Sequence, residues 1–186
     1  GDATIRSWDL KNDKEAWALR GHLREATCLA ISLDGRWALS GGDDEILRLW
    51  DTLTGTERYQ FLGHTGDITA VAFSSDGRTL ASASGDMSVK LWDIPSGGER
   101  ATLTGHRTEV LAVAFSPDGK LLATGGRDGR VCLWNVATAE KLSEWKYNGT
   151  VAAVAFSHDG QNVLAGGMGV PVLWNAATVI FPIRPC

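Results

Sequence analysis

The chain has 186 residues, enough for one domain or a large part of one, and a formal net charge of −4. This charge provides no basic field for nucleic acid or an acidic membrane surface, so we expect neither as a partner. No apolar run approaches the roughly 20 residues that a membrane-spanning helix needs. The hydrophobic fraction of 44% is compatible with a packed core.

The beginning of the chain predicts two strands, one ending at Trp8 and the next over residues 14–20. From residue 21 onward one pattern recurs: Gly-His, an apolar segment, an Asp-Gly turn, a second apolar segment, and Trp followed by Asp or Asn. The Trp residues that close these units are Trp8, Trp50, Trp92, Trp134 and Trp174, with gaps of 42, 42, 42 and 40 residues. A fixed period of this length indicates a repeat architecture.

The unit at 105–146 shows the pattern most clearly. Three short apolar segments and one more polar segment predict four strands, and no segment has a helical period. These segments are 110–115, 121–124, 131–134 and 141–145. Pro-Asp-Gly at 117–119 predicts a tight turn with Gly at positive φ. Four short antiparallel strands in about 42 residues match one propeller blade, so we predict an all-β fold of propeller blades.

The period divides the chain into about four and a half blades. We predict the last two strands of a partial blade, then three full blades, then a degenerate blade. In this order they span residues 1–20, 21–62, 63–104, 105–146 and 147–186. Pro182 and Pro185 cannot donate a ladder hydrogen bond, so the final strand is expected to be an edge strand or irregular.

These motifs resemble those of the WD-repeat β-propeller family, and the resemblance covers nearly the whole chain. The motifs are Gly-His at 21–22, 63–64 and 105–106, Asp-Gly at 34–35, 76–77, 118–119 and 159–160, and Trp-Asp or Trp-Asn at 8–9, 50–51, 92–93, 134–135 and 174–175. The resemblance implies a loop face that binds peptides or other proteins. It also implies that the fold itself performs no chemistry.

The resemblance further implies a polar network in each blade, built from a His, a hydroxyl, an Asp and the Trp. The matching sets are His22, Ser40, Asp44 and Trp50; His64, Ser82, Asp86 and Trp92; and His106, Thr124, Asp128 and Trp134. A buried imidazole and indole need such partners. Ser, His and Asp also suggest a hydrolase triad, but a triad occurs once at one cleft. We therefore predict a structural role, with no catalytic residue, metal or cofactor.

The last unit departs from this pattern. Tyr147 stands at the His position, Ala165 stands at the hydroxyl position, and the Asp is lost in a shortening near residues 168–169. Trp174 alone remains. Removing all members of a network together costs less stability than removing one member, because the members that remain then lack hydrogen-bond partners. We predict that this blade is looser, or that something beyond this chain holds it.

Candidate partner-binding residues lie at the loop face. Glu25, Asp67, Glu109 and Thr150 precede the first strands, Asp43 and Arg127 precede a network Asp, and Thr27, Thr69 and Leu111 are expected to point toward the mouth of the central channel. The acidic positions favour a basic partner, with Arg127 available to an acidic group. Alternatively, these charged side chains form an ordinary solvated surface and bind no partner. Trp37 is either an exposed anchor or packs against a neighbouring blade.

The sequence predicts a protein–protein interaction scaffold. The alternative is a regulatory or sensory propeller domain of a longer enzyme whose catalytic part lies outside these residues. Three explanations for the incomplete ring stay open: further blades in a longer chain, a homodimer that forms one ring, or a small distorted ring. Exposed strand edges would favour association.

The three cysteines match no zinc-binding spacing, and their odd number argues against a disulfide framework. Cys28 and Cys132 fall in apolar segments and are predicted to act as small buried hydrophobic residues, whereas Cys186 is the last residue. Cysteines that form no disulfide framework indicate a reducing compartment, so we expect a cytoplasmic protein.

Overall fold

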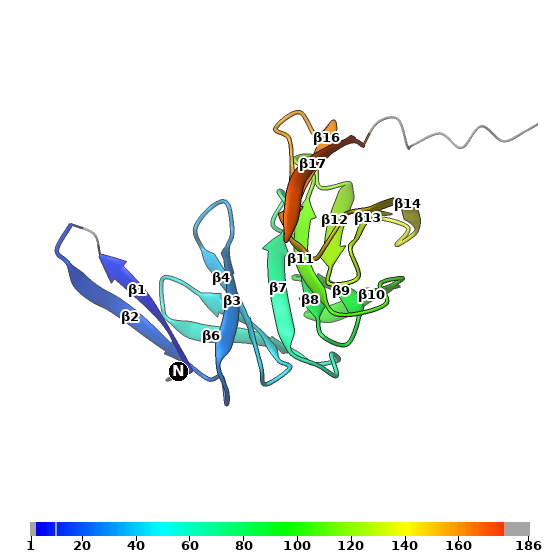
Figure 1. Cartoon of the computed structure of the whole chain (residues 1–186). Helices are drawn as coiled ribbons and strands as arrows, with labels where there is room; N and C mark the ends of the chain where they lie inside the picture. The colour runs from blue at the N-terminus through cyan, green and yellow to red at the C-terminus, as the bar shows by residue number, and fades with distance from the viewer. Residues whose placement is uncertain (1–2, 10, 177–186) are drawn as a thin grey trace, which may run out of the picture.

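The computed structural model describes residues 3–9 and 11–176, which form antiparallel strands joined by turns (Figure 1). The first sheet pairs β1 (Thr4–Asp9) with β2 (Lys14–Arg20). Three complete four-stranded sheets follow. Their strands are β3 (Ala26–Ile31), β4 (Trp37–Gly42), β5 (Leu47–Asp51) and β6 (Thr56–Phe61); β7 (Ile68–Phe73), β8 (Thr79–Ser84), β9 (Ser88–Asp93) and β10 (Gly98–Thr104); and β11 (Val110–Phe115), β12 (Leu121–Gly126), β13 (Arg130–Asn135) and β14 (Lys141–Lys146). The all-β class and the four-stranded blades are confirmed.

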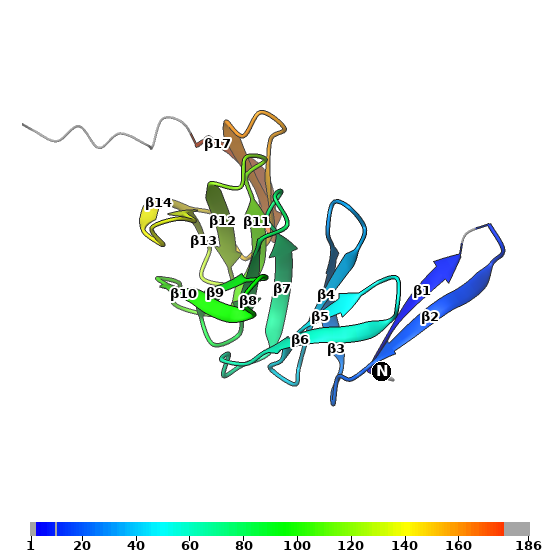
Figure 2. The ribbon, with the colours of Figure 1, turned by 180° about the vertical axis from the view of Figure 1, so that it is seen from behind.

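The last described sheet has three strands, β15 (Val151–Phe156), β16 (Asn162–Gly167) and β17 (Gly169–Asn175). The irregular final strand predicted near Pro182 lies outside the described residues. Seen from opposite sides, sheet β1–β2 and sheet β15–β17 stand at opposite ends of the described chain (Figures 1 and 2). The described sheets therefore form an open series of blades and not a closed ring.

One type of turn closes the first hairpin of the four sheets that follow β1–β2. In the β11–β12 turn the Ser116 hydroxyl donates to Asp118 Oδ1 at 2.7 Å, and the same oxygen accepts the Lys120 N–H at 3.1 Å. Gly119 has φ of 70°, a conformation that glycine adopts without steric cost. The same Ser-x-Asp-Gly turn recurs at 32–35, 74–77 and 157–160. Local sequence thus determines where each pair of inner strands reverses.

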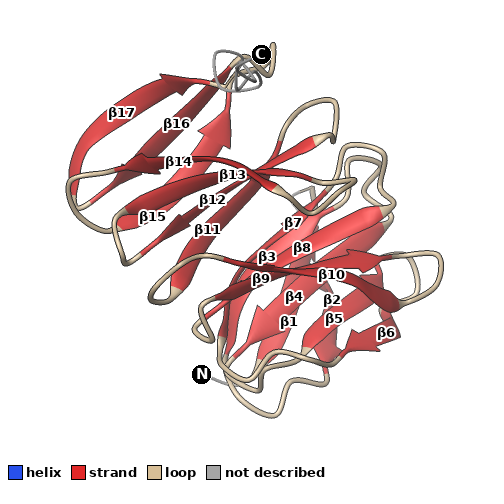
Figure 3. Ribbon diagram, turned by 90° about the vertical axis from the view of Figure 1, so that its right-hand side faces the viewer, coloured by secondary structure: helices blue, strands red, loops and turns tan. Residues whose placement is uncertain are grey.

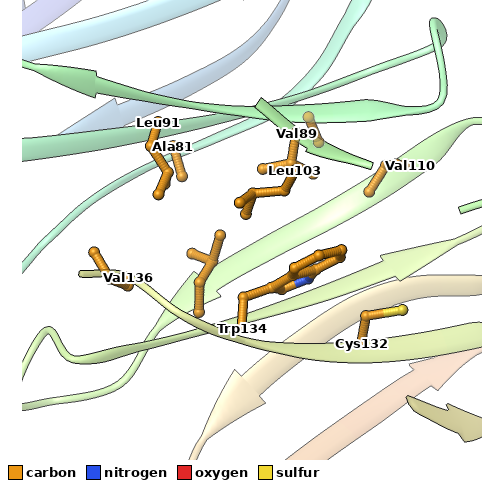
Figure 4. Close-up of a cluster of buried hydrophobic side chains, with 10 residues drawn as sticks. Ala81, Val89, Leu91, Leu103, Val110, Cys132, Trp134 and Val136 are labelled. Carbon is orange, nitrogen blue, oxygen red and sulfur yellow. The ribbon is translucent and has the colours of Figure 1, made fainter. Parts of the chain in front are cut away.

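The sheets pack face to face along the chain (Figure 3). We call the face toward the preceding sheet the near face and the opposite one the far face. Figure 4 shows one such junction, where Leu91 and Leu103 from the far face of β7–β10 point toward Trp134 on the near face of β11–β14. Each fully buried side chain of this size contributes about 1.5–3 kcal/mol. The core is therefore distributed over the junctions between blades.

Each junction contains the same aromatic contact. The Trp of the third strand shares a core with an apolar residue of the preceding sheet's fourth strand. The pairs are Leu19 with Trp50, Phe61 with Trp92, Leu103 with Trp134, and Trp145 with Trp174. Phe61 and Trp92 have ring centroids 5.4 Å apart. The repeated Trp therefore joins consecutive blades.

The cysteines and the remaining tryptophans lie mainly inside these junctions. Cys132 is buried, and burial raises the pKa of its thiol to about 12. Burial likewise raises the pKa of Cys28 to about 11, and Cys28 is half-buried. Trp37 is half-buried against the core between sheets β3–β6 and β7–β10, so it packs against a neighbouring blade. Cys186 lies outside the described residues.

Candidate interaction site

The polar network in sheet β7–β10 joins a loop to the sheet. Asp86 Oδ2 lies 2.7 Å from His64 Nδ1, and Ser82 Oγ lies 2.8 Å from His64 Nε2. Trp92 Nε1 donates to the same Ser82 oxygen at 2.9 Å. Because an ionised carboxylate can only accept, Nδ1 donates its hydrogen to Asp86. The Ser82 oxygen accepts the indole hydrogen and also contacts Nε2. This order of hydrogen bonds places a hydrogen on Nδ1 of His64.

The other two complete sheets have the same arrangement. His22 Nε2 lies 2.7 Å from Ser40 Oγ, and Trp50 donates to that oxygen at 2.8 Å. His106 Nε2 lies 2.8 Å from Thr124 Oγ1, which accepts the Trp134 indole at 3.0 Å. The carboxylates of Asp44 and Asp128 bind the Nδ1 atoms at 2.9 and 3.1 Å.

Each network carboxylate also anchors the loop that carries its histidine. Asp86 accepts the Thr65 N–H at 3.1 Å, and Asp44 and Asp128 accept the equivalent amides. The three hydroxyl-bearing residues, Ser40, Ser82 and Thr124, are completely buried. A hydroxyl that is buried and already bonded to an indole and an imidazole has no access to a substrate. The network therefore joins the loop that carries the histidine to the sheet that carries the hydroxyl and the Trp.

The network environments lower the pKa of one carboxyl group, that of Asp86, and of one imidazole, that of His106. Burial raises the pKa of Asp86, but hydrogen bonds from Ser88, His64 and the Thr65 amide outweigh it and lower the value to about 2. Burial lowers the pKa of His106, and the hydrogen bond to Asp128 opposes this effect without cancelling it. The environment of Asp86 therefore favours the ionised carboxylate, and the environment of His106 favours the neutral imidazole.

The last described sheet has no such network. Ala165 is completely buried at the hydroxyl position, and Trp174 stacks on Trp145 with ring centroids 5.6 Å apart and an interplanar angle of 14°. Tyr147 is buried at the histidine position, and its hydroxyl has no hydrogen-bond partner. Aromatic stacking therefore replaces hydrogen bonding around this Trp, which is only half-buried.

A loop rim is formed where the loop before each first strand meets the turn between the second and third strands. A backbone hydrogen bond joins the two segments in each blade. The donors and acceptors are Asp43 N to Glu25 O at 3.0 Å, Gly85 N to Asp67 O at 2.9 Å, Arg127 N to Glu109 O at 2.9 Å, and Met168 N to Thr150 O at 3.0 Å. These bonds bring the two groups of sequence-predicted rim residues together, blade by blade.

The charges on this rim are not equivalent. Arg127 forms an ion pair with Glu109, with Nη2 and Oε2 3.1 Å apart, so each already has an intramolecular partner. Within the described residues, the side chains of Glu25, Asp43 and Asp67 form no hydrogen bond or ion pair. The three uncompensated carboxylates therefore lie on the two blades that begin at β3 and β7.

The threonines expected near the channel mouth contact the neighbouring blade. Thr27 Oγ1 donates to the Ile68 carbonyl at 2.6 Å, and Thr69 Oγ1 donates to the Val110 carbonyl. Leu111, the third residue of this group, is half-buried and has no hydroxyl to make the bond. The hydroxyls of Thr27 and Thr69 thus link consecutive inner strands.

Two apolar rim residues were not selected from the sequence. Leu23 is 82% exposed in the loop after His22, and Met87 is exposed in the β8–β9 turn with φ of 70°. Glu45 and Gly129 hold the position of Met87 in the adjacent blades, also at positive φ. The sequence did contain a signal for these two residues, because each is an apolar residue in a loop segment that is otherwise polar or glycine-rich.

Among residues 3–9 and 11–176, no group of three or more His, Cys, Asp or Glu side chains could hold a metal ion. The same part of the chain has no helix of a length and hydropathy suited to crossing a membrane.

Residues 14–51, 55–93 and 97–135 each match the family model described as WD domain, G-beta repeat. Each match begins at or just before the fourth strand of one sheet and ends with the third strand of the next, so the matched repeat is offset by one strand from the sheet. Together the matches cover more than half of the chain. A comparison with curated proteins found no match.

Proposed function

The chain belongs to the WD-repeat family, and from this premise we propose that it is an interaction scaffold whose loop rim binds a basic segment of a protein partner. Members of this family are generally protein-interaction scaffolds and are typically non-catalytic. The observation that carries the finer proposal is the set of uncompensated carboxylates of Glu25, Asp43 and Asp67. Basic side chains would supply the missing counter-charges.

The rim also offers apolar contacts beside these charges. Leu23 lies two residues before Glu25, and Met87 lies two residues after Gly85, whose amide binds the Asp67 carbonyl. Exposed Arg24 and Arg107 belong to the same group of loops and would repel Lys or Arg placed near them. The best-fitting partner is therefore a segment with Lys or Arg next to an apolar residue, positioned over the β3 and β7 blades.

This proposal assigns no catalytic role to the three Ser/Thr-His-Asp sets. Their hydroxyls are buried and already accept an indole hydrogen bond. An uncharged, inaccessible hydroxyl that recurs in each of the three complete sheets supports a structural function.

Binding of peptide panels tests the proposal. Fluorescence polarisation would compare Lys- and Arg-containing peptides with acidic peptides of equal length, at low and moderate salt. The triple variant Glu25→Gln, Asp43→Asn, Asp67→Asn should weaken binding of the basic peptides about tenfold or more and reduce its salt dependence.

The control is the double variant Asp13→Asn, Glu140→Gln, which removes exposed carboxylates outside the loop rim. It should bind the basic peptides like the unmodified chain. Equal binding of acidic peptides, or unchanged affinity in the triple variant, would contradict the proposal.

A further inference from the structure

A groove lies between sheets β3–β6 and β7–β10, at the end of the blades opposite the loop rim. Its volume is about 170 Å³, and residues of both sheets line it: Trp37, Leu49, Arg58, Tyr59, Ile94 and Pro95. Trp37 begins β4, and Ile94 follows the last residue of β9. Because the strands are antiparallel, these strand ends point away from the loops between second and third strands. The groove therefore shares no residue with the loop rim.

Much of the groove's lining belongs to the core of this junction. Leu49 is completely buried, and Trp37, Tyr59 and Ile94 are half-buried against the same core. The Tyr59 ring also packs closely on Gly97, where a Cβ atom would lie 2.9 Å from the ring. An apolar cavity of about 150 Å³ can hold a benzene molecule, so this groove has room for one large apolar side chain.

Two arginines flank the groove. Arg36 lies over the Trp37 ring, with Cζ 5.0 Å from the ring centroid, and Arg58 lies over the Tyr59 ring at 5.0 Å. Both arginines are exposed, and within the described residues neither guanidinium forms an ion pair. Stacking on a ring orients each planar guanidinium and leaves its N–H donors available to an anion.

The carboxylates that neighbour these arginines in sequence have other partners. Asp34 Oδ1 accepts the Ser32 hydroxyl at 2.6 Å and the Arg36 amide at 3.1 Å. The Ser32 hydrogen bond is the main cause that lowers the pKa of Asp34, and the Arg36 guanidinium adds the smallest effect. Glu57, next to the second arginine, pairs with Arg48. Both flanking arginines thus lack a carboxylate of their own within ion-pair distance.

The next junction shows that the blade repeat does not require this groove. Thr79 and Ala101 stand there at the positions of Trp37 and Tyr59. The cavity at that junction, of about 310 Å³, has no aromatic lining. Its charged lining residues have both signs: Asp76, Arg100, Asp118 and Lys120. Of these two junctions, only the one between β3–β6 and β7–β10 combines aromatic walls with charge that is solely basic.

We propose that this groove binds an acidic segment of a protein partner, with one large apolar side chain beside Trp37 and with carboxylates on the two flanking arginines. Arginine binds carboxylates through paired, charge-assisted hydrogen bonds. Arginine and aromatic residues are also the types that contribute most to affinity at interfaces. The loop rim carries uncompensated carboxylates, so the two ends of the blades would select partner segments of opposite charge. This inference does not rest on the function proposed for the loop rim.

A nucleic acid fits the groove less well. Arg36 and Arg58 already cover one face of each aromatic ring on which a base would stack. Two arginines provide few phosphate contacts, and the whole chain has a net charge of −4. A short acidic segment needs only the contacts that the groove offers.

Fluorescence polarisation tests the proposal with a labelled peptide that has Asp and Glu on both sides of a central Leu. Replacing the Leu by Ala should weaken binding about tenfold or more, because the apolar contact is lost. Replacing the acidic residues by Lys should weaken binding at the groove by a similar factor. Acidic peptides without a large apolar residue therefore do not report on this groove.

Variants of the chain locate the binding. Arg36→Gln together with Arg58→Gln should weaken binding of the Leu peptide about tenfold or more and reduce its salt dependence. Both residues are exposed, and thermal unfolding checks that the fold is kept. Arg24→Gln together with Arg107→Gln is the control, because it removes the same charge from exposed loop-rim positions. This control should bind the Leu peptide like the unmodified chain.

The triple variant of the loop rim should bind the Leu peptide within about twofold of the unmodified chain. A failure at the groove is therefore distinguishable from a failure at the loop rim. Unchanged affinity in the variant Arg36→Gln, Arg58→Gln would overturn the proposal. So would displacement of the peptide by a single-stranded oligonucleotide at equal concentration. A chain mass that rises with concentration, and does so only with the two arginines present, would assign the groove to a second copy and overturn it as well.

Discussion

The three complete sheets and the last described sheet hold the same Trp in two different ways. In the complete sheets the indole donates to a buried hydroxyl and is 2% exposed, as at Trp92. In sheet β15–β17, Trp174 stacks on Trp145 and remains half-buried. The comparison shows that the Trp serves as a packing element between blades even without its network. In the complete sheets the network also attaches the loop to the sheet, as Asp86 accepts the Thr65 N–H.

The far faces show a second difference. Leu91 and Leu133 are completely buried beneath the following sheet, whereas the equivalent Leu173 is 60% exposed. A cavity of about 170 Å³ lies on this face, lined by small apolar residues together with Leu164 and Pro171. Within the described residues no sheet covers this face of β15–β17, so exposure at this position follows the neighbouring sheet and not the residue type.

The largest effect should come from removing the Trp itself. Trp92→Ala should lower the free energy of unfolding by about 3–5 kcal/mol, because it leaves a large cavity and removes the hydrogen bond to the buried Ser82 oxygen. The matched change Trp174→Ala should cost clearly less, since that ring is half-buried and has no network. Urea unfolding would measure both, and equal losses would contradict the proposed difference between the sheets.

Removing the network hydroxyl should have the next largest effect. Ser82→Ala leaves the Trp92 indole and the His64 imidazole without their shared partner and should cost about 1–3 kcal/mol. Ala165→Ser is the matched change in the last sheet, where no histidine is present to use a hydroxyl. It should give no stabilisation in thermal unfolding. A gain from Ala165→Ser would show that this sheet retains a usable network position.

Tyr147→Phe should stabilise the last sheet. The buried Tyr147 hydroxyl has no hydrogen-bond partner, so its removal should raise the free energy of unfolding by roughly 1 kcal/mol. Tyr59→Phe serves as the control at a half-buried tyrosine. Local hydrogen exchange in β15–β17 would measure the change, and faster exchange would mean that the hydroxyl has a stabilising partner.

The smallest effect should be a dependence of stability on pH. Burial lowers the pKa of His106 below 6.5, so the folded state favours the neutral ring. The stability from this group is present above pH 6.5 and is lost as the pH falls through the folded-state pKa. Asp86 contributes in a lower window, because its pKa falls from 3.8 to about 2; this contribution is lost only below pH 4.

Urea unfolding between pH 7.5 and pH 5 would measure the His106 contribution. His106→Gln should reduce the fall in stability over this range, whereas His158→Asn, at an exposed histidine, should preserve it. A stability that rises on acidification in the unmodified chain would refute the assignment.

The strand pattern could be predicted because it depends on local chemistry and on a fixed period, whereas the network members were expected from the resemblance to the WD-repeat family. Ser-x-Asp-Gly reverses the chain by bonds within four residues, as at Ser116 and Gly119. The spacing of the Trp residues identifies equivalent positions, so Tyr147 and Ala165 could be recognised as departures. Leu23 and Met87 were missed because no periodic pattern marks an exposed loop residue.

By itself, the sequence determined the all-β class, the blade period and the residues that occupy equivalent places. Only the tertiary structure decided that Arg127 pairs with Glu109, that Thr27 bonds to the Ile68 carbonyl, and that Leu29 and Ile31 lie uncovered. Turn chemistry acts within a few residues, whereas the Arg127–Glu109 ion pair joins residues 18 positions apart and the Thr27 bond joins residues 41 positions apart. Residues of the same type and repeat position, such as Trp8 and Trp50, therefore differ in exposure because their neighbours differ.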